Sequence, residues 1–356
     1  MNKKFDIKNF RRIAIIQTAF LGDIALALYF AETIKELHPD CEIIFVSNPI
    51  AVELLKSSKN IDIVISFDKR GSDSGIKGIR DLSDKLKKLE TECIFGLQRS
   101  MRTSLVTYLA KPKLSVGFEN STFSILYKKR AKYILGIHET QRNNKLLLDL
   151  VHDDEGKSLI EKHRWGVDLE INNDIKEKID SKLNILGVKN TDKLIAIAPG
   201  SVWETKRWIE DYYTELIIKL INQGLNPILI GAKNEVSLSE KIRKATHCLS
   251  LVGETSIMEL LELLNRVKLT ITNDSAPTHL AGLVRCKTIT IFGSTVPEFG
   301  FGPLGPFDIA VGNNNLKCRP CGIHGSRKCP IKSFDCMKTI TTDMVYQSVL
   351  KILEID

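Results

Sequence analysis

The sequence predicts an α/β protein made of two doubly wound domains, each with a parallel sheet. The chain has 356 residues, and at ~100–200 residues per domain this length favours two domains over one. Hydrophobic residues make up 43% and charged residues 26%, which excludes disordered, collagen-like and coiled-coil classes. Short apolar runs also alternate with amphipathic segments along most of the chain, and this alternation is typical of βαβ units.

The first domain is expected over residues 1–175. Its apolar runs, which we interpret as strands, are 13–17, 42–46, 62–66 and 93–97. The amphipathic segments between them are expected to form helices, near 24–37, near 76–89 and after Met101. Residues 136–178 lose the alternation and become polar, so the closing helix of this domain and a linker are placed there.

The second domain is expected over residues 176–356, where the alternation starts again. The expected strands are 194–199, 226–231, 268–272 and 287–293. The expected helices are 209–222, 234–245, 256–264 and one that begins near Ala276. A last amphipathic segment, 342–353, is expected as a terminal helix that packs on either domain.

The N-terminus superficially resembles a signal anchor, because a basic leader precedes an apolar stretch from Ile13 to Ala31. Asp23 lies near the middle of that stretch, and an ionised carboxylate there costs ~2.5–3.5 kcal/mol on insertion into a bilayer. The stretch is therefore interpreted as strand, loop and helix. No other segment is long and apolar enough to span a membrane.

The positive charge of the chain is local. Lys and Arg number 51 against 43 Asp and Glu, a net charge of +8. Residues 99–133 contain one acid, Glu119, and the basic residues Arg99, Arg102, Lys111, Lys113, Lys128, Lys129, Arg130 and Lys132. Such a patch favours an anionic partner, which is an acidic or phosphorylated acceptor, a lipid surface or a nucleic acid. The alternative is a solvated basic face.

The loops after strands are the places to search for a site. Neither half contains a G-x-G-x-x-G turn or a G-x-x-x-x-G-K-[ST] loop, which argues against nicotinamide dehydrogenases and P-loop enzymes. Ligands of open α/β sheets bind beyond the carboxyl ends of the strands. Three post-strand loops carry unusual polar residues: 18–28, 198–208 and 270–282.

The first loop, TAFLGDIALAL, offers one carboxylate. Gly22 permits a tight turn, and Asp23 stands at the start of the following helix. Asp23 is either a helix N-cap, a role worth ~0.5–2 kcal/mol, or a general base that faces a ligand crevice.

The second loop, APGSVWETKRW, is suited to phosphate oxygens. Ser201, Lys206 and two neighbours, Thr205 and Arg207, all carry suitable donors. The alternative is a polar loop that packs through its two tryptophans.

The third loop, TITNDSAPTHLAG, predicts an anion site at a helix start. Asp274 and Ser275 suit capping, and Pro277 suits a first helical turn. Backbone N–H groups at Ser275 and Ala276, aided by the helix dipole, would bind an anion. His279 would lie one turn into the helix and point to the same opening.

These three loops, in this order, resemble glycosyltransferase family 9, the ADP-heptose heptosyltransferases of lipopolysaccharide inner-core assembly. The matching segments are LGDIALAL, PGSVWETKRW, IGAKNE, NDSAPTHLAG and FGSTVPEFGFGP. The resemblance implies a GT-B architecture, in which two Rossmann-like domains face an interdomain cleft. The acceptor would bind the N-terminal domain and the nucleotide sugar the C-terminal domain.

The resemblance also assigns roles to residues. Asp23 matches the catalytic carboxylate, Ser201 and Lys206 the phosphate-binding loop, and Glu235 a carboxylate at the ribose or base end of the donor. The loop around the diphosphate and sugar is matched by Asp274, Ser275, Ala276 and His279. Two positions depart from the family pattern: Ala276 replaces a usual glycine and Val296 a common aspartate. The implied reaction is a one-step, inverting displacement in which Lys206 and the helix N-terminus stabilise the leaving diphosphate, without a cofactor.

The same resemblance gives the basic stretch a partner, the anionic inner core of lipopolysaccharide, with Arg99 and Arg102 as acceptor-binding residues. It implies a cytoplasmic enzyme with peripheral contact to the inner membrane and no nucleic-acid partner, and it leaves the oligomeric state open. Two alternatives stand beside it. One is a related enzyme with a protein or capsule acceptor, and the other is a non-catalytic nucleotide-sugar-binding protein.

The eight cysteines form two sets. Four are scattered in apolar surroundings and are interpreted as buried small side chains: Cys41, Cys93, Cys248 and Cys286. The other four crowd into one segment, residues 318–336, hereafter the Cys-rich segment: Cys318, Cys321, Cys329 and Cys336. Their density favours a structural tetrathiolate zinc or iron site over disulfides in a reducing compartment. The alternative is four reduced, unligated thiols.

Overall fold

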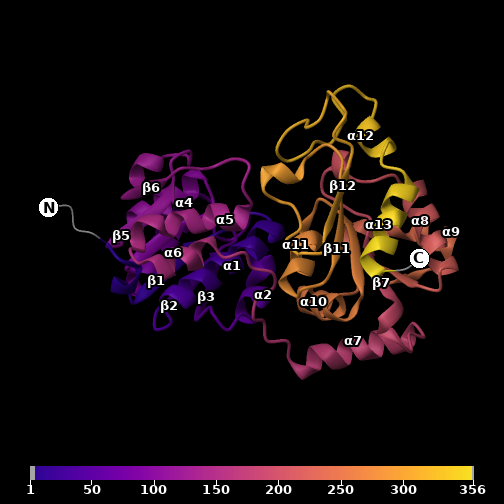
Figure 1. The fold of residues 1–356 in the computed structure, drawn as a ribbon. Helices are drawn as coiled ribbons and strands as arrows, with labels where there is room; N and C mark the ends of the chain where they lie inside the picture. Colours follow the sequence, from indigo (N-terminus) through magenta and orange to yellow (C-terminus); the bar gives the residue numbers. More distant parts are fainter. Residues whose placement is uncertain (1–4, 355–356) are drawn as a thin grey trace. The chain divides into compact units, whose positions relative to one another are not determined.

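A computed structural model describes residues 5–354 of the chain (Figure 1). The chain divides into two compact units, here unit 1 (residues 1–170) and unit 2 (residues 171–356). The division falls between Glu170 and Ile171, whereas the sequence placed it after residue 175. Among the described residues, no helix is long and apolar enough to cross a membrane.

Unit 1 is built on a six-stranded parallel sheet in the order β3-β2-β1-β4-β5-β6. The strands are β1 (Arg12–Ile16), β2 (Glu42–Ser47), β3 (Ile63–Ser66), β4 (Cys93–Gly96), β5 (Leu114–Phe118) and β6 (Lys129–Ala131). The helices are α1 (Leu21–Leu37), α2 (Val52–Lys56), α3 (Gly75–Lys88), α4 (Met101–Ala110), α5 (Glu139–Asn144) and α6 (Asp154–Glu161). This strand order is that of the Rossmann fold, and its topological switch point lies between β1 and β4.

Unit 2 repeats the same plan, with the strand order β12-β11-β10-β7-β8-β9. The strands are β7 (Leu194–Ala198), β8 (Asn226–Leu229), β9 (Leu249–Ser250), β10 (Leu269–Asn273), β11 (Thr288–Phe292) and β12 (Ile309–Gly312). The helices are α7 (Asn173–Ile185), α8 (Glu210–Asn222), α9 (Val236–Thr246), α10 (Ile257–Arg266), α11 (Ala276–Leu283), α12 (Asp335–Lys338) and α13 (Thr342–Leu353). Its switch point lies between β7 and β10.

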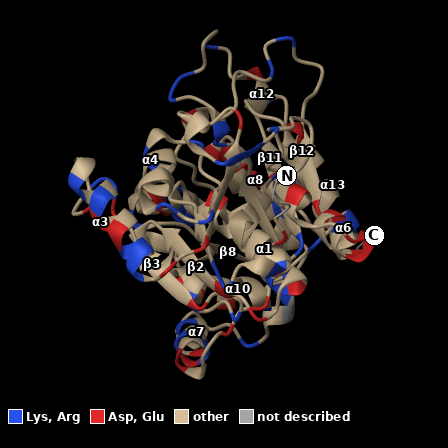
Figure 2. Ribbon diagram, turned by 90° about the vertical axis from the view of Figure 1, so that its left-hand side faces the viewer, with Lys and Arg blue, Asp and Glu red and all other residues tan. Residues whose placement is uncertain are grey.

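The strand and helix patterns have simple physical origins. The central strands β1, β4 and β7 are largely apolar runs because helices cover both faces of a parallel sheet, whereas β10 is buried throughout although it contains Thr270, Thr272 and Asn273. In α3, Ile79, Leu82 and Leu86 are buried at helical spacing, and Lys, Arg and Asp side chains occupy the exposed part of the helix (Figure 2). Helix α10 begins with a capping box, in which Ser256 and Glu259 bond each other's backbone N–H groups.

The structure differs from the sequence-based expectation at several elements. Helix α1 begins at Leu21 and follows Phe20 as its N-cap, so Asp23 lies in the first turn and the N-cap interpretation is wrong. Strands β5, β6, β9 and β12 were not predicted. The polar stretch 136–178, expected as one helix and a linker, contains α5, α6 and the start of α7. The terminal helix α13 packs within unit 2, on α8, β11 and β12 (Figure 1).

Candidate active site

The first cluster of polar residues lies at the switch point of unit 1. Thr18 follows β1 and Gln98 follows β4, and the Thr18 hydroxyl donates a hydrogen bond to the Gln98 side-chain oxygen. Lys69 follows β3, and its Nζ lies 3.4 Å from the Thr18 Oγ1. Sequence reasoning missed Lys69, although its place directly after a strand end marks it by the same rule that selected the other loops.

Asp23 lies close enough to this cluster for its charge to act on Lys69. Its side chain is half-buried in the first turn of α1. Burial lowers the pKa of Lys69, and the charges of Arg70 and Arg102 lower it further. The carboxylate of Asp23 raises the pKa of Lys69 and so offsets part of this shift. The Nε of Arg102 is buried and has no hydrogen-bond partner among the described residues. The cluster therefore combines the carboxylate of Asp23 with the positively charged side chains of Lys69, Arg70 and Arg102.

Arg99 is held by an aromatic ring in the same unit. Its guanidinium carbon lies 3.9 Å from the ring centroid of Tyr133, and that of Arg142 lies 4.3 Å from the same centroid. Arg142 is fully buried, donates to the Tyr133 hydroxyl at 2.9 Å and forms an ion pair with Glu139. Burial raises the pKa of the Tyr133 phenol, and the nearby Glu139 charge raises it further. This arrangement fixes where Arg99 stands.

Other residues of the basic stretch are engaged within unit 1. Lys113 pairs with Glu92, and Lys129 lies 3.5 Å from Asp149. Lys128 donates to two backbone carbonyl oxygens, at 2.6 and 3.0 Å. These three lysines stabilise the fold, so the stretch is only in part a free basic surface. Arg99 and Arg102 are the two members of the stretch whose charges act on the groups around Asp23.

The second cluster lies at the switch point of unit 2, where loops after β7 and β10 meet. Lys206 Nζ lies 2.6 Å from Asp274 Oδ2, and the Thr295 hydroxyl donates to the same oxygen at 2.6 Å. The side chains of Lys206 and Asp274 are only 13% and 7% exposed. Two residues that the sequence assigned to one diphosphate site are therefore in direct contact.

Asn273, a fully buried residue, holds the loop that follows β7. Its Nδ2 donates to the carbonyl oxygens of Pro199 and Gly200 at 2.9 and 3.1 Å, and its Oδ1 accepts from Trp208 N at 2.9 Å. The carboxylate of Glu235 lies against Gly200, where a Cβ would come within 1.9 Å of Glu235 Oε1. A side chain at 200 would require the Glu235 carboxylate to move, and Glu235 therefore lies beside the loop that follows β7.

The start of α11 completes the second cluster. Ser275 is the N-cap residue but makes no side-chain cap, because its hydroxyl donates to the Asn273 carbonyl at 3.2 Å. Ala276 begins the helix, and a helix N-terminus favours an anion. His279 is buried one turn later, with its ring 6.3 Å from that of Phe301. Ser201 is buried in the loop after β7 and accepts from Trp203 N at 3.3 Å.

The four thiols of the Cys-rich segment differ in exposure. Cys336 is buried, Cys318 and Cys329 are half-buried, and Cys321 is exposed. Burial raises the pKa of Cys336 to about 11, and the charges of the other three thiols add to the shift. Among the described residues, no group of three or more Cys, His, Asp or Glu side chains is arranged to hold a metal ion. The four scattered cysteines are buried, as expected.

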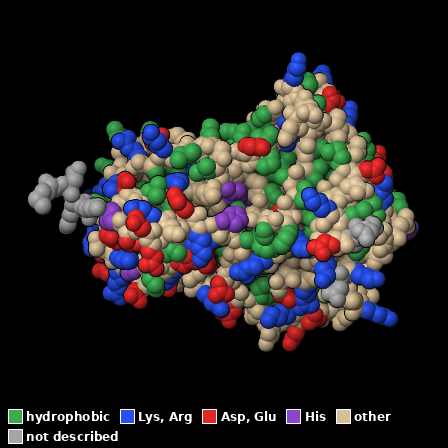
Figure 3. All heavy atoms as spheres, viewed as in Figure 1, with side chains coloured by type: hydrophobic (Ala, Val, Ile, Leu, Met, Phe, Trp, Pro, Cys, Tyr) green, Lys and Arg blue, Asp and Glu red, His purple; other side chains and the backbone are tan. Residues whose placement is uncertain are grey.

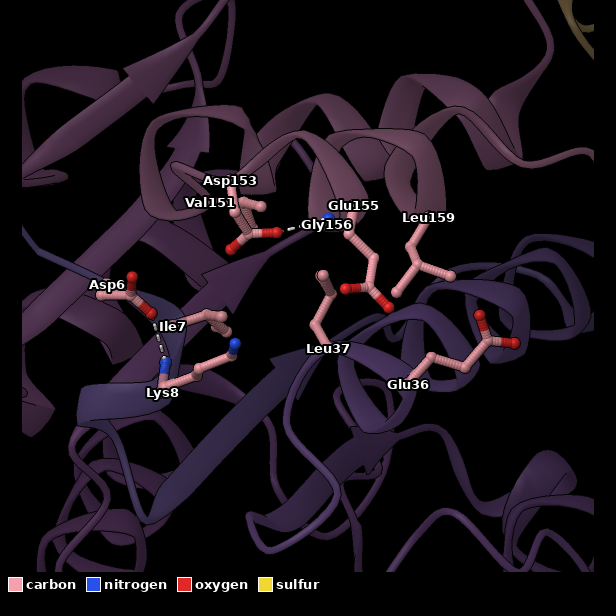
Figure 4. Close-up of a pocket in the computed structure, with 10 residues that line it drawn as sticks. All are labelled: Asp6, Ile7, Lys8, Glu36, Leu37, Val151, Asp153, Glu155, Gly156 and Leu159. Carbon is pink, nitrogen blue, oxygen red and sulfur yellow. Dashed lines mark hydrogen bonds between the residues drawn. The ribbon is translucent and has the colours of Figure 1, made fainter.

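A small pocket of about 110 Å³ lies elsewhere in unit 1, between the start of the chain, the end of α1 and α6 (Figure 4). Two of its carboxylates serve the local backbone: Asp6 accepts from Lys8 N, and Asp153 accepts from Gly156 N as the cap of α6. Acidic and basic side chains are interspersed over the face on which α6 lies (Figure 3). This pocket is not part of the candidate site, because it lies at the opposite edge of the sheet from the carboxyl strand ends.

Comparison with known proteins identifies relatives over the whole chain. The family model described as "Glycosyltransferase family 9 (heptosyltransferase)" matches residues 79–331. The lipooligosaccharide heptosyltransferase 2 of Campylobacter jejuni is 24% identical over 356 residues, which cover 96% of this chain and 98% of that protein.

Solved structures agree on the fold. A family 9 glycosyltransferase from Veillonella parvula has a TM-score of 0.85 at 20% identity and covers 98% of both chains. The ADP-heptose lipopolysaccharide heptosyltransferase II of Escherichia coli has a TM-score of 0.77 at 19% identity, covering 96% of this chain and 99% of the other. TibC of enterotoxigenic E. coli, an iron-containing dodecameric glycosyltransferase, has a TM-score of 0.57 at 15% identity, covering 98% and 78%.

Proposed function

The chain belongs to glycosyltransferase family 9 and has the two Rossmann-like units of a GT-B enzyme, and on this premise we propose that it is an inverting heptosyltransferase. It moves a heptose from an ADP-heptose-type donor to the inner core of lipopolysaccharide. One observation carries the proposal. Each unit brings its candidate polar residues to its own topological switch point, where ligands of such sheets bind.

Unit 2 is the donor-binding unit in this proposal. Lys206 supplies a cation to the diphosphate, and the N-terminus of α11 at Ser275 and Ala276 supplies backbone N–H groups. Charge that develops on the leaving diphosphate is stabilised by these groups, so catalysis needs no metal ion. Glu235 contacts the ribose or base end of the donor, since it lies beside the loop that holds the phosphates.

Unit 1 is the acceptor-binding unit, and Asp23 is the general base. The acceptor hydroxyl is a poor nucleophile, so Asp23 takes its proton as the oxygen attacks the anomeric carbon of the heptose. A single displacement inverts the configuration at that carbon. Arg99 and Arg102, with Lys69, bind carboxylate and phosphate groups of the acceptor, because the charge of Asp23 acts on Lys69 together with that of Arg102 and on Tyr133 together with that of Arg99.

The proposed acceptor also indicates where in the cell the enzyme acts. We propose that it works in the cytoplasm, as a peripheral protein on the inner face of the inner membrane. Two observations support membrane contact. Large apolar side chains are exposed within the basic stretch, with Phe123 51% and Ile125 79% exposed, and the stretch itself is attracted to anionic lipid. Sedimentation with vesicles of anionic or neutral lipid tests this step.

We further propose that the Cys-rich segment binds one structural zinc or iron ion through its four thiols. The charges of the other three thiols act on the pKa of Cys336, and this proximity to Cys336 supports the role. Burial opposes ionisation of Cys329, but hydrogen bonds from backbone N–H groups of residues 331–334 together lower its pKa, which suits a thiolate ligand. The iron of the TibC structure gives a precedent on a related fold.

The decisive experiment is a donor screen followed by a transfer assay. ADP-, UDP- and GDP-sugars are tested for protection against thermal unfolding, where a ligand at ~100 times its dissociation constant adds ~2.7 kcal/mol. We expect protection by ADP-heptose and transfer to an inner-core acceptor. Transfer to a protein or capsule acceptor alone would replace the proposed acceptor, and binding without any transfer would identify a nucleotide-sugar-binding protein.

A further inference from the structure

The Cys-rich segment contacts both loops that form the donor half of the site. It follows β12 as an irregular stretch of unit 2 and runs into the start of α12 (Figure 1), and it contains Lys and Arg at several positions. One part of the segment bonds the loop after β7, which carries Lys206. Another part bonds the loop after β11, which carries Thr295, the hydrogen-bond donor to Asp274.

Thr205, the neighbour of Lys206, is the junction with the first loop. Its hydroxyl donates to the Ser326 carbonyl at 3.0 Å and accepts from Ser326 N at 2.7 Å and from Ser294 Oγ at 3.1 Å. Its backbone N also donates to the Ser326 carbonyl, at 3.1 Å. Thr205 is only 2% exposed, so its hydroxyl is shielded from water, and loss of the hydroxyl removes the partner of the buried Ser294 hydroxyl and of the Ser326 N–H.

Arg319 is the junction with the second loop. Its Nε donates to the Gly293 carbonyl at 2.7 Å, and one terminal nitrogen donates to the carbonyl oxygens of Phe292 and Thr295 at 3.1 and 2.9 Å. The backbone N of Cys321 donates to the Ser294 carbonyl at 2.9 Å. The two residues therefore hold the segment on the loop that contains Thr295.

The segment also contacts the proposed donor-binding lysine directly. A Cβ at Gly325 would lie 3.1 Å from Lys206 Cγ and 3.3 Å from its Cε, and Gly325 has a φ of +78°. The backbone at 325 thus packs against the aliphatic part of Lys206. The ammonium group at the other end of that side chain meets Asp274.

From these contacts we propose that the Cys-rich segment is a positioning element of the donor site, and that Thr205 is the positioning residue through which it orients Lys206. This inference rests on the proposed function, in which Lys206 binds the donor diphosphate. Thr205 itself touches neither substrate. The hydrogen bonds of Thr205 hold the loop of Lys206 against the Cys-rich segment. The ammonium group of Lys206 is thereby positioned before the donor binds.

The test compares Thr205→Val, which keeps the shape but removes the hydroxyl, with Thr205→Ser, which keeps the hydroxyl. We expect Thr205→Val to raise both the donor KM and the ADP dissociation constant about tenfold, since several shielded hydrogen bonds are lost. The acceptor KM should change less than about twofold, and Thr205→Ser should restore donor affinity. A purely structural role predicts a lower melting temperature with unchanged donor affinity, and that result would overturn the inference.

A second measurement uses the wild-type protein, so it tests the inference even if the Thr205→Val variant folds poorly. Arg327 and Lys328 are exposed trypsin sites within the segment. If the segment belongs to the donor site, saturating ADP should slow cleavage there, while cleavage at the exposed Lys132 of unit 1 keeps its rate. Equal cleavage rates with and without ADP would contradict the inference. The Lys206→Ala variant distinguishes failure of this inference from failure of the proposed function. Unchanged donor affinity in Lys206→Ala would refute the proposed function itself.

Discussion

Lys206 and Asp274 form a buried ion pair in unit 2, with Nζ 2.6 Å from Oδ2. Both residues come from loops that follow strands on either side of the switch point. An ion pair of this kind is weak evidence for stability, because the cost of desolvating two charges offsets much of their attraction. Its position instead indicates a function: the pair holds a cation ready at the place where a diphosphate is proposed to bind. Thr295 bonds the same Asp274 oxygen, so Asp274 would keep this partner if Lys206 bound the proposed diphosphate instead.

The first prediction concerns Lys206. We expect Lys206→Ala to raise the donor KM about 10- to 100-fold, because a charge-assisted hydrogen bond to the diphosphate is lost. Steady-state kinetics against donor concentration measure this effect. Lys241→Ala is the matched control, since Lys241 is a largely exposed lysine of the same unit that pairs with Glu210. Donor affinity equal to that of the control would remove Lys206 from the site.

The second prediction concerns Asp23. Asp23→Asn keeps the size of the side chain but cannot accept the acceptor proton, so turnover should fall ~10²–10⁴-fold. Melting temperature and ADP-sugar affinity should stay close to wild type, because the proposed donor site lies in unit 2. Glu53→Gln, a change of an exposed acid in the first turn of α2, is the control. Retention of more than about a tenth of the activity is incompatible with Asp23 as the essential base.

The third prediction concerns the acceptor. Charge reversal at Arg99 and Arg102 should raise the apparent acceptor KM, with a smaller difference at high salt, and should leave nucleotide binding nearly intact. Lys132→Glu makes the control, because Lys132 is exposed in the same basic stretch. An equal effect of Lys132→Glu would mean that only net charge matters. A parallel loss of donor binding would indicate misfolding or a wrong assignment of the two units.

The fourth prediction concerns the Cys-rich segment. We expect about one equivalent of zinc or iron per chain after anaerobic purification, and its loss in Cys321→Ser together with part of the thermal stability. Elemental analysis of both proteins measures the metal. Cys248→Ser, at a buried cysteine outside the segment, should keep the metal. Four titratable free thiols in metal-free wild-type protein would support unligated cysteines instead.

Local sequence patterns were sufficient for most of the central strands and the longer helices. A strand buried on both faces of a parallel sheet is a continuous apolar run, as in β1 and β7. Three of the four missed strands, β6, β9 and β12, are short and lie at the sheet edges, where bonds to a neighbouring strand stabilise them more than their own residues do. The fourth, β5, is a buried five-residue strand whose sequence contains a serine and a glycine. The burial of Arg142 could not be predicted from the sequence either. The carbonyl oxygens that accept its hydrogen bonds and the Tyr133 ring that it contacts come together only in the folded chain.

The sequence by itself determined which residues are available for chemistry. Asp23, Lys206 and Asp274 each follow a strand, and the carboxyl ends of parallel strands share one edge of a sheet. Tertiary structure decided the partners of these residues. Lys206 meets Asp274 across 68 positions of sequence, and Thr205 meets Ser326 across 121. Hydrogen bonds and ion pairs act over a few ångströms, so contacts between distant loops exist only after the sheet order has brought their ends together.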